Sequence, residues 1–149
     1  MPIIQLLNDD LKDAIRSKDP LKRTVLRTLL SEIANAKIAK RSDLTEEEIL
    51  IVLTKQSQQR KDSIEAFAEA GRKDLEDKEK SELEIISGYL PEQLSESEVL
   101  DIISDVIDKI GATGPSDMGK VMGAVMPKVR GRADGKIINS IVTSKLKDL

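Results

Sequence analysis

Aliphatic side chains recur at intervals of three and four residues along almost the whole chain, and this spacing is the strongest constraint on its fold. Ile3, Leu7, Leu11 and Ile15 show the pattern at the start of the sequence. In an α-helix such residues share one face, which can pack against a neighbouring helix. No stretch shows the sustained two-residue alternation and β-branched enrichment that are typical of a strand. The sequence therefore predicts an all-α protein.

The chain offers very few aromatic residues with which to build a core. Phe67 and Tyr89 are the only two among 149 residues, and there is no tryptophan. The core must therefore consist of Leu, Ile, Val, Met and Ala, which interlock well between helices but anchor interfaces poorly. Hydrophobic residues at 39% and charged residues at 34% fit a globular helical protein rather than a disordered chain.

Capping residues, glycines and prolines divide the pattern into seven expected helices. These lie at about 3–19, 20–40, 45–71, 72–88, 95–111, 116–127 and 137–146. Thr45 and Ser95 each begin a capping box, and Pro127 is expected to end or kink the sixth helix before a loop at 128–135. Because Pro91 restrains the residue before it, Tyr89–Leu94 is the expected joint between two domains. We predict a multihelical N-terminal domain of four helices at 1–90 and a C-terminal three-helix bundle at 91–149.

The chain contains neither cysteine nor histidine, and this limits its chemistry. Thiolate nucleophiles and disulfides are excluded, and the commonest general base and zinc ligand are missing. The acidic groups at 46–48 are explained as helix N-terminal charges, and those at positions 9, 10 and 13 as a solvated face. Their spacing matches no metal-binding loop, and no glycine-rich phosphate loop is present. We expect no catalytic residue, no metal and no cofactor.

The sequence also bears on location. No apolar run approaches the roughly 20 residues that span a bilayer. Residues 1–10 lack the basic and long apolar regions of a signal peptide. The chain is therefore expected to have no membrane partner and to lie in the cytoplasm.

The net charge is −3, but the last segment of the chain is basic. Its candidate RNA-binding residues are Lys120, Lys128, Arg130, Gly131, Arg132, Gly135 and Lys136. In one interpretation the cations contact RNA phosphates, and the two glycines let the backbone approach closely. In the other, the segment is a solvated loop whose glycines serve as a helix cap and a turn. The residues alone leave both interpretations open.

A second candidate lies at 54–63, where no residue is apolar although the helical pattern resumes at Ile64. This stretch could be an exposed overhang of the helix. Alternatively, Arg27, Arg60 and Lys61 could form a second anion site in a polar groove. Nothing in the sequence separates these two possibilities.

Gly119 and Gly123 lie one helical turn apart. The favoured interpretation is that they let two helices pack closely, despite about 1 kcal/mol each in helix propensity. The alternative is a smooth strip that faces RNA or a partner protein.

Several ordered motifs resemble those of the YqeY-like (GatB/YqeY) family. They occur at 59–63 (QRKDS), 70–72 (AGR), 89–95 (YLPEQLS), 117–122 (DMGKVM) and 131–135 (GRADG). The resemblance covers essentially the whole chain. It implies an all-helical fold whose three-helix C-terminal part is of the GatB/YqeY type. It also implies kinship with the tail of the B subunit of the tRNA-dependent amidotransferase.

In that relative the tail contacts tRNA, and similar appendages on a glutaminyl-tRNA synthetase help to hold tRNA. The kinase and glutaminase chemistry lies in other domains and subunits. A carbon–nitrogen ligase label, with glutamine as amido-N-donor, would therefore describe an activity that this chain cannot perform alone. The resemblance implies a non-catalytic tRNA-binding protein, whose partners would be tRNA and an aminoacyl-tRNA synthetase or an amidotransferase.

The composition also limits how RNA could be recognised. The basic segment has no aromatic residue on which a base could stack, so contacts would go through phosphates and shape. A protein–protein adaptor or a homo-oligomeric structural protein is the alternative, suggested by the acidic helix from Glu96 to Asp108. A weaker alternative is a component of a carbon–nitrogen ligase that requires other subunits.

Overall fold

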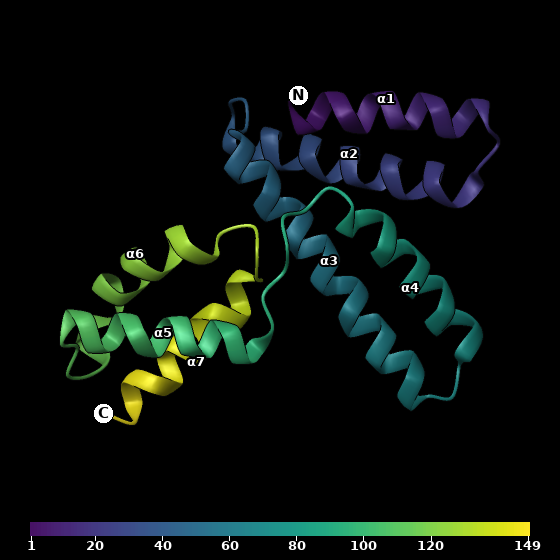
Figure 1. Ribbon diagram of the computed structural model, residues 1–149. Helices are drawn as coiled ribbons and strands as arrows, with labels where there is room; N and C mark the ends of the chain where they lie inside the picture. Colours follow the sequence, from purple (N-terminus) through teal and green to yellow (C-terminus); the bar gives the residue numbers. More distant parts are fainter. The chain divides into compact units, whose positions relative to one another are not determined.

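The computed structural model describes residues 1–149 and contains seven α-helices and no strand (Figure 1). The helices are α1 (Ile3–Arg16), α2 (Pro20–Lys40), α3 (Glu46–Glu69), α4 (Lys73–Ser87), α5 (Glu96–Ile110), α6 (Met118–Val129) and α7 (Gly135–Lys147). A short 3-10 turn, η1 (Pro115–Asp117), precedes α6. The predicted all-α fold is confirmed.

The chain divides into two compact units, Met1–Leu90 and Pro91–Leu149. The first contains α1 to α4, and the second contains α5 to α7. That each unit folds independently stays a prediction.

The first unit is built around an aliphatic core to which all four of its helices contribute. The pair α1 and α2 runs antiparallel, and α3 and α4 form a second hairpin (Figure 1). The buried residues of this core are Leu7, Ala14, Val25, Leu26, Leu29, Ile33, Ile49, Leu53 and Ile86. Beyond α4, the hydroxyl of Tyr89 donates a hydrogen bond to Asp10 of α1. Burial, together with the Asp10 carboxylate, raises the pKa of this phenol.

The middle of the α3–α4 hairpin is polar, in contrast to the aliphatic core. Gln56 and Ser57 are only 5% and 1% exposed. Arg60 donates to the side-chain oxygen of Gln56 at 3.1 Å, and its Nε lies 3.8 Å from a carboxylate oxygen of Glu79. One turn further along α4, Glu82 is buried as well, at 9% exposure. We call these five residues the polar layer. The polar stretch is therefore packed against α4 and is not simply an exposed overhang.

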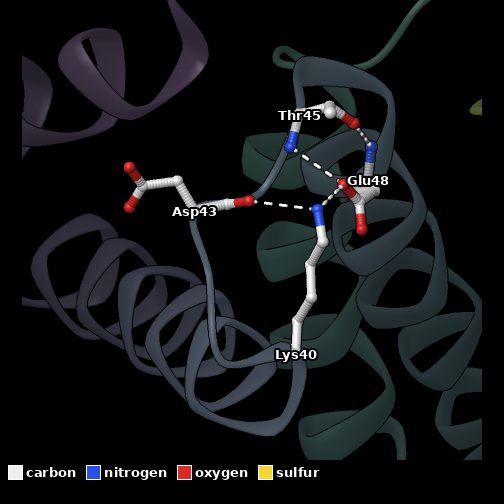
Figure 2. A network of polar contacts seen from close by, with 4 residues as sticks. All are labelled: Lys40, Asp43, Thr45 and Glu48. Atoms are coloured by element: carbon white, nitrogen blue, oxygen red, sulfur yellow. Dashed lines mark hydrogen bonds and ion pairs between the residues drawn. The ribbon is translucent and has the colours of Figure 1, made fainter.

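The connection between α2 and α3 is held by a small network of polar contacts (Figure 2). The ammonium of Lys40 donates to the Glu48 carboxylate at 2.6 Å and to the backbone carbonyl of Asp43 at 3.1 Å. Thr45 and Glu48 form the predicted capping box, in which each side chain accepts the backbone N–H of the other residue. The Lys40 ammonium and then the Thr45 N–H lower the pKa of Glu48 to about 2.

This low pKa predicts how the stability of the first unit depends on pH. The pKa of Glu48 is lower in the folded state than its ordinary value of 4.5. The carboxylate therefore stabilises the fold above pH 4.5, and this contribution is lost as the pH falls toward 2. We expect Glu48→Gln to lower the urea midpoint at neutral pH and to have a smaller effect in acid. Glu65→Gln, at an exposed position of the same helix, is the control. A pH-independent effect of Glu48→Gln would contradict this account.

The second unit packs α5, α6 and α7 around a core without aromatic residues. Its buried residues are Val99, Ile103, Val106, Ile107, Val121, Val125, Val129, Ile138, Val142 and Leu146. Partly buried methionines, among them Met118, Met122 and Met126, pack against this core. The unbranched methionine side chain suits the irregular gaps between helices. The interpretation of these methionines as core residues is consistent with this packing.

One helix boundary differs from the prediction, because α6 continues through Pro127 to Val129. The side chain of Val129 is completely buried in the core of the second unit. Pro127 has no N–H to donate to the carbonyl of Gly123, but Gly123 is exposed, so water can reach that carbonyl. Burial of Val129 outweighs the missing hydrogen bond. The loop between α6 and α7 is therefore shorter than predicted and comprises residues 130–134.

Candidate nucleic-acid interface

The 130–134 loop turns sharply at Gly131. This glycine has a φ of +77°, a left-handed conformation that favours glycine, and it is buried. The N–H groups of Arg132 and Ala133 both donate to the carbonyl of Val129, at 2.9 and 3.2 Å. Gly131 therefore closes the end of α6, as the helix-cap interpretation predicts. Gly135 differs from it, because it is the exposed first residue of α7.

The predicted cations occupy three kinds of position in the second unit. Lys128 and Lys136 are exposed in the last turn of α6 and the first turn of α7, and Arg130 is exposed between them. Lys120 is also exposed, but it lies in the first turn of α6, about 12 Å from Lys128 along the helix axis. The structure thus brings Lys128, Arg130 and Lys136 to one loop and leaves Lys120 apart. Arg132 is only half-exposed.

Arg132 has a partner within the second unit. Its Nε donates to the backbone carbonyl of Glu92 at 3.2 Å. The N–H of Leu94 donates to the Arg132 carbonyl at 2.8 Å, and the side-chain amide of Gln93 donates to the Gly131 carbonyl at 2.9 Å. Sequence reasoning treated residues 89–94 only as a joint and missed this connection. The one available signal was that the 89–95 and 131–135 motifs both occur in the chain.

An open hollow of about 480 Å³ lies at the start of α7. It is lined by Gly135, Lys136, Asn139 and Ser140. The preceding Asp134 makes no side-chain hydrogen bond to cap the helix. An ammonium, an amide, a hydroxyl and the positive end of the helix dipole therefore surround the hollow, and each of these groups favours an anion. This arrangement suits a phosphate group.

The residues of the second predicted anion site are placed differently. Arg60 points into the α3–α4 hairpin, toward Gln56 and Glu79, and its side chain is 14% exposed. Lys61 and Arg27 are exposed on α3 and α2. An anion at Arg60 would have to compete with the Glu79 carboxylate. The geometry therefore offers less support for this site than for the 130–134 loop.

Gly119 and Gly123 lie in the open on α6. A Cβ atom added to either residue would meet no other atom within 4 Å. Neither glycine is therefore required for close helix packing inside the second unit, which was the favoured interpretation of the sequence. The packing of this unit leaves two helix-destabilising residues unexplained.

We expect Gly119→Ala and Gly123→Ala each to stabilise the second unit by about 0.5–1 kcal/mol, because alanine favours the helix and has room at both positions. Thermal unfolding of each variant measures the change. Gly111→Ala is the matched control and should destabilise, since Gly111 caps α5 at a φ of +74°. Lower stability of both α6 variants would show that the glycines have a structural role after all.

Two helical units, one of which carries exposed cations around a polar hollow, define a helical protein with a candidate anion-binding surface. Comparison with known proteins places it more closely. The chain belongs to the family described as Yqey-like protein, whose model matches residues 4–146.

Curated relatives of this chain are proteins named altered inheritance of mitochondria protein 41, mitochondrial. The relative from Pyrenophora tritici-repentis is 30% identical over 149 residues, covering 99% of this chain and 80% of the relative. That from Lachancea thermotolerans is 41% identical over 113 residues, covering 74% of this chain and 60% of the relative. That from Saccharomyces cerevisiae strain YJM789 is 41% identical over 104 residues, covering 69% and 56%. The chain therefore spans little more than half of the last two relatives. Their shared name states no enzymatic activity.

The predicted cytoplasmic location is contradicted by this comparison, because the relatives are named as mitochondrial proteins. The prediction was wrong because it rested on missing features, namely a signal peptide and a spanning segment. Such features direct proteins to the secretory route or a membrane, and their absence does not select among the remaining compartments. No helix combines the length and the hydropathy needed to cross a membrane.

Proposed function

We propose that the protein is a non-catalytic tRNA-binding accessory protein that grips tRNA through its second unit. The observation that supports this proposal is the grouping of Lys128, Arg130 and Lys136 around one short loop, beside the open hollow at the start of α7. Three cations and a helix N-terminus in one place suit the closely spaced phosphates of folded RNA.

The mode of binding follows from the residues that the second unit contains. Both aromatic residues, Phe67 and Tyr89, lie in the first unit, so the second unit cannot stack bases on aromatic rings. Recognition would use phosphates and shape, with low sequence specificity and strong salt dependence. The acidic surface of α5 repels phosphates and would restrict RNA to the side of the loop. Holding the body of a tRNA would leave its acceptor end to a partner, such as an aminoacyl-tRNA synthetase or an amidotransferase.

Binding of the full chain to bulk tRNA at several salt concentrations tests the proposal. We expect the affinity to fall steeply with salt. The variant Lys128→Ala/Arg130→Ala/Lys136→Ala should bind more weakly and lower the salt slope by roughly two to three, about one for each phosphate that is no longer neutralised. The change in slope separates the removal of phosphate-binding cations from a general loss of folded protein.

The control variant Arg27→Ala/Lys55→Ala/Lys61→Ala removes the same charge from exposed positions of the first unit. It should bind tRNA almost as the parent does. Loss of binding in the control alone would favour the second anion site instead. No binding by the parent at low salt would overturn the proposal and favour the adaptor or homo-oligomer. Co-purification of amidotransferase subunits would favour the carbon–nitrogen ligase component.

A further inference from the structure

The start of the second unit and the 130–134 loop are tied together by hydrogen bonds from Arg132, Leu94 and Gln93. The side-chain amide of Gln93 also donates to the carbonyl of Pro91, at 2.9 Å. One amide group thus joins the backbone before α5 to the backbone after α6. We call the contacts among residues 91–94, Gly131 and Arg132 the loop tether.

The tether engages the two loop residues that are least available to a ligand. Gly131 is buried, and its carbonyl is already occupied by Gln93. The Nε of Arg132 is committed to the Glu92 carbonyl, and its positive charge also helps to lower the pKa of Glu98 at the start of α5, after the larger effects of Ser95. Arg130, Lys128 and Lys136 are exposed, whereas Arg132 faces the protein.

We infer that Gln93 and Arg132 are positioning residues, which hold the loop in the shape that presents Lys128, Arg130 and Lys136 to phosphate. This inference rests on the proposed function and divides the basic residues into two groups. Without the tether, the loop would sample other shapes, and binding would have to order it again. The joint before α5 is then part of the binding machinery, although its side chains do not touch RNA.

Two substitutions separate positioning from direct contact. Gln93→Met keeps the length of the side chain and its neutrality but removes both donors. Arg132→Lys keeps the charge but loses the planar guanidinium and its Nε–H. If Arg132 contacted a phosphate, lysine would replace it well, because an ammonium also binds phosphate as a point charge. If Arg132 positions the loop, lysine should be nearly as damaging as alanine.

The experiment measures tRNA binding and, without RNA, the hydrogen exchange of the Leu94 amide, which donates to Arg132. We expect Gln93→Met and Arg132→Lys to speed this exchange and to weaken tRNA binding about five- to tenfold, the scale of re-ordering a few residues on binding. Arg130→Lys is the matched control in the same loop and should stay within about twofold of the parent. Val106→Ala destabilises the same unit from the buried face of α5 and, under conditions where it is folded, should leave the affinity unchanged.

The outcomes separate the inference from the function on which it rests. If the parent binds tRNA and Gln93→Met binds equally well despite faster exchange, the inference is overturned and the proposed function stands. If Arg132→Lys binds like the parent whereas Arg132→Ala does not, Arg132 is a phosphate contact and the inference is again overturned. If the parent fails to bind tRNA, both are overturned.

Discussion

Ile103→Ala is expected to destabilise the second unit by about 2–5 kcal/mol, the range measured for truncating buried aliphatic residues. Ile103 lies in the middle of α5 and is completely buried among valines, isoleucines and a leucine of α5, α6 and α7. A unit of this size has only a few kcal/mol of stability, at roughly 0.05–0.15 kcal/mol per residue. The loss should therefore unfold α5–α7 at room temperature.

The same experiment tests whether the two units fold independently. We expect circular dichroism of Ile103→Ala to show a partial loss of helix at room temperature and a remaining transition that belongs to α1–α4. Leu100→Ala removes a partly exposed aliphatic residue of the same helix and should cost less than about 1 kcal/mol. A single cooperative transition for the whole molecule would show that the units fold as one.

Arg60→Met is expected to destabilise the first unit by about 2 kcal/mol, less than the roughly 3–5 kcal/mol for breaking a fully buried pair. The Arg60 and Glu79 side chains are 14% and 20% exposed, so water still reaches part of the pair and makes the expected loss smaller. Removing the cation leaves Glu79 and Glu82 near each other without a counter-charge. Arg16→Met, in an ion pair whose side chains are 79% and 72% exposed, should change stability by less than about 0.5 kcal/mol.

The pH dependence distinguishes a charge effect from lost packing at Arg60. Burial, and then the neighbouring Glu82, raise the pKa of Glu79 above its ordinary value of 4.5, and Arg60 opposes this shift. A carboxylate with a raised folded-state pKa destabilises the fold at higher pH, and protonation relieves this as the pH falls toward 4.5. Urea unfolding should therefore show a larger loss for Arg60→Met at about pH 8 than at about pH 5. The double variant Arg60→Met/Glu79→Leu should recover most of the stability. A loss that does not change with pH would mean that Arg60 acts only through packing.

The helical half of the prediction succeeded because its signals are local. Capping boxes at Thr45 and Ser95 depend on residues three positions apart, and both occur in the structure. The one boundary that failed, at Pro127, was decided by a contact between helices, since Val129 completes the core of the second unit. The function of Gly119 and Gly123 was misjudged for the related reason that their surroundings depend on which face of α6 packs inward.

The candidate site shows a similar division between local and long-range information. Composition excluded cysteine and histidine chemistry and aromatic stacking in the second unit, because those conclusions need only the residues present. The grouping of Lys128, Arg130 and Lys136 also follows from their nearness in the chain. The role of Arg132 does not, since its partner Glu92 lies 40 residues away. The polar layer likewise requires the pairing of α3 with α4, which brings Arg60 to Glu79.

The sequence by itself determined that this protein is helical, where most of its helices begin and end, that its core is aliphatic, and that its basic residues gather near the C-terminus. Each of these properties follows from residue type or from spacings within a few helical turns. Only the tertiary structure decided which charges are available. It turned Arg60 into the α3–α4 hairpin and Arg132 toward the 91–94 segment, and it left Lys128 and Lys136 exposed. A cation becomes available to a ligand, or committed to a carboxylate or a carbonyl, according to which distant segment folds against it.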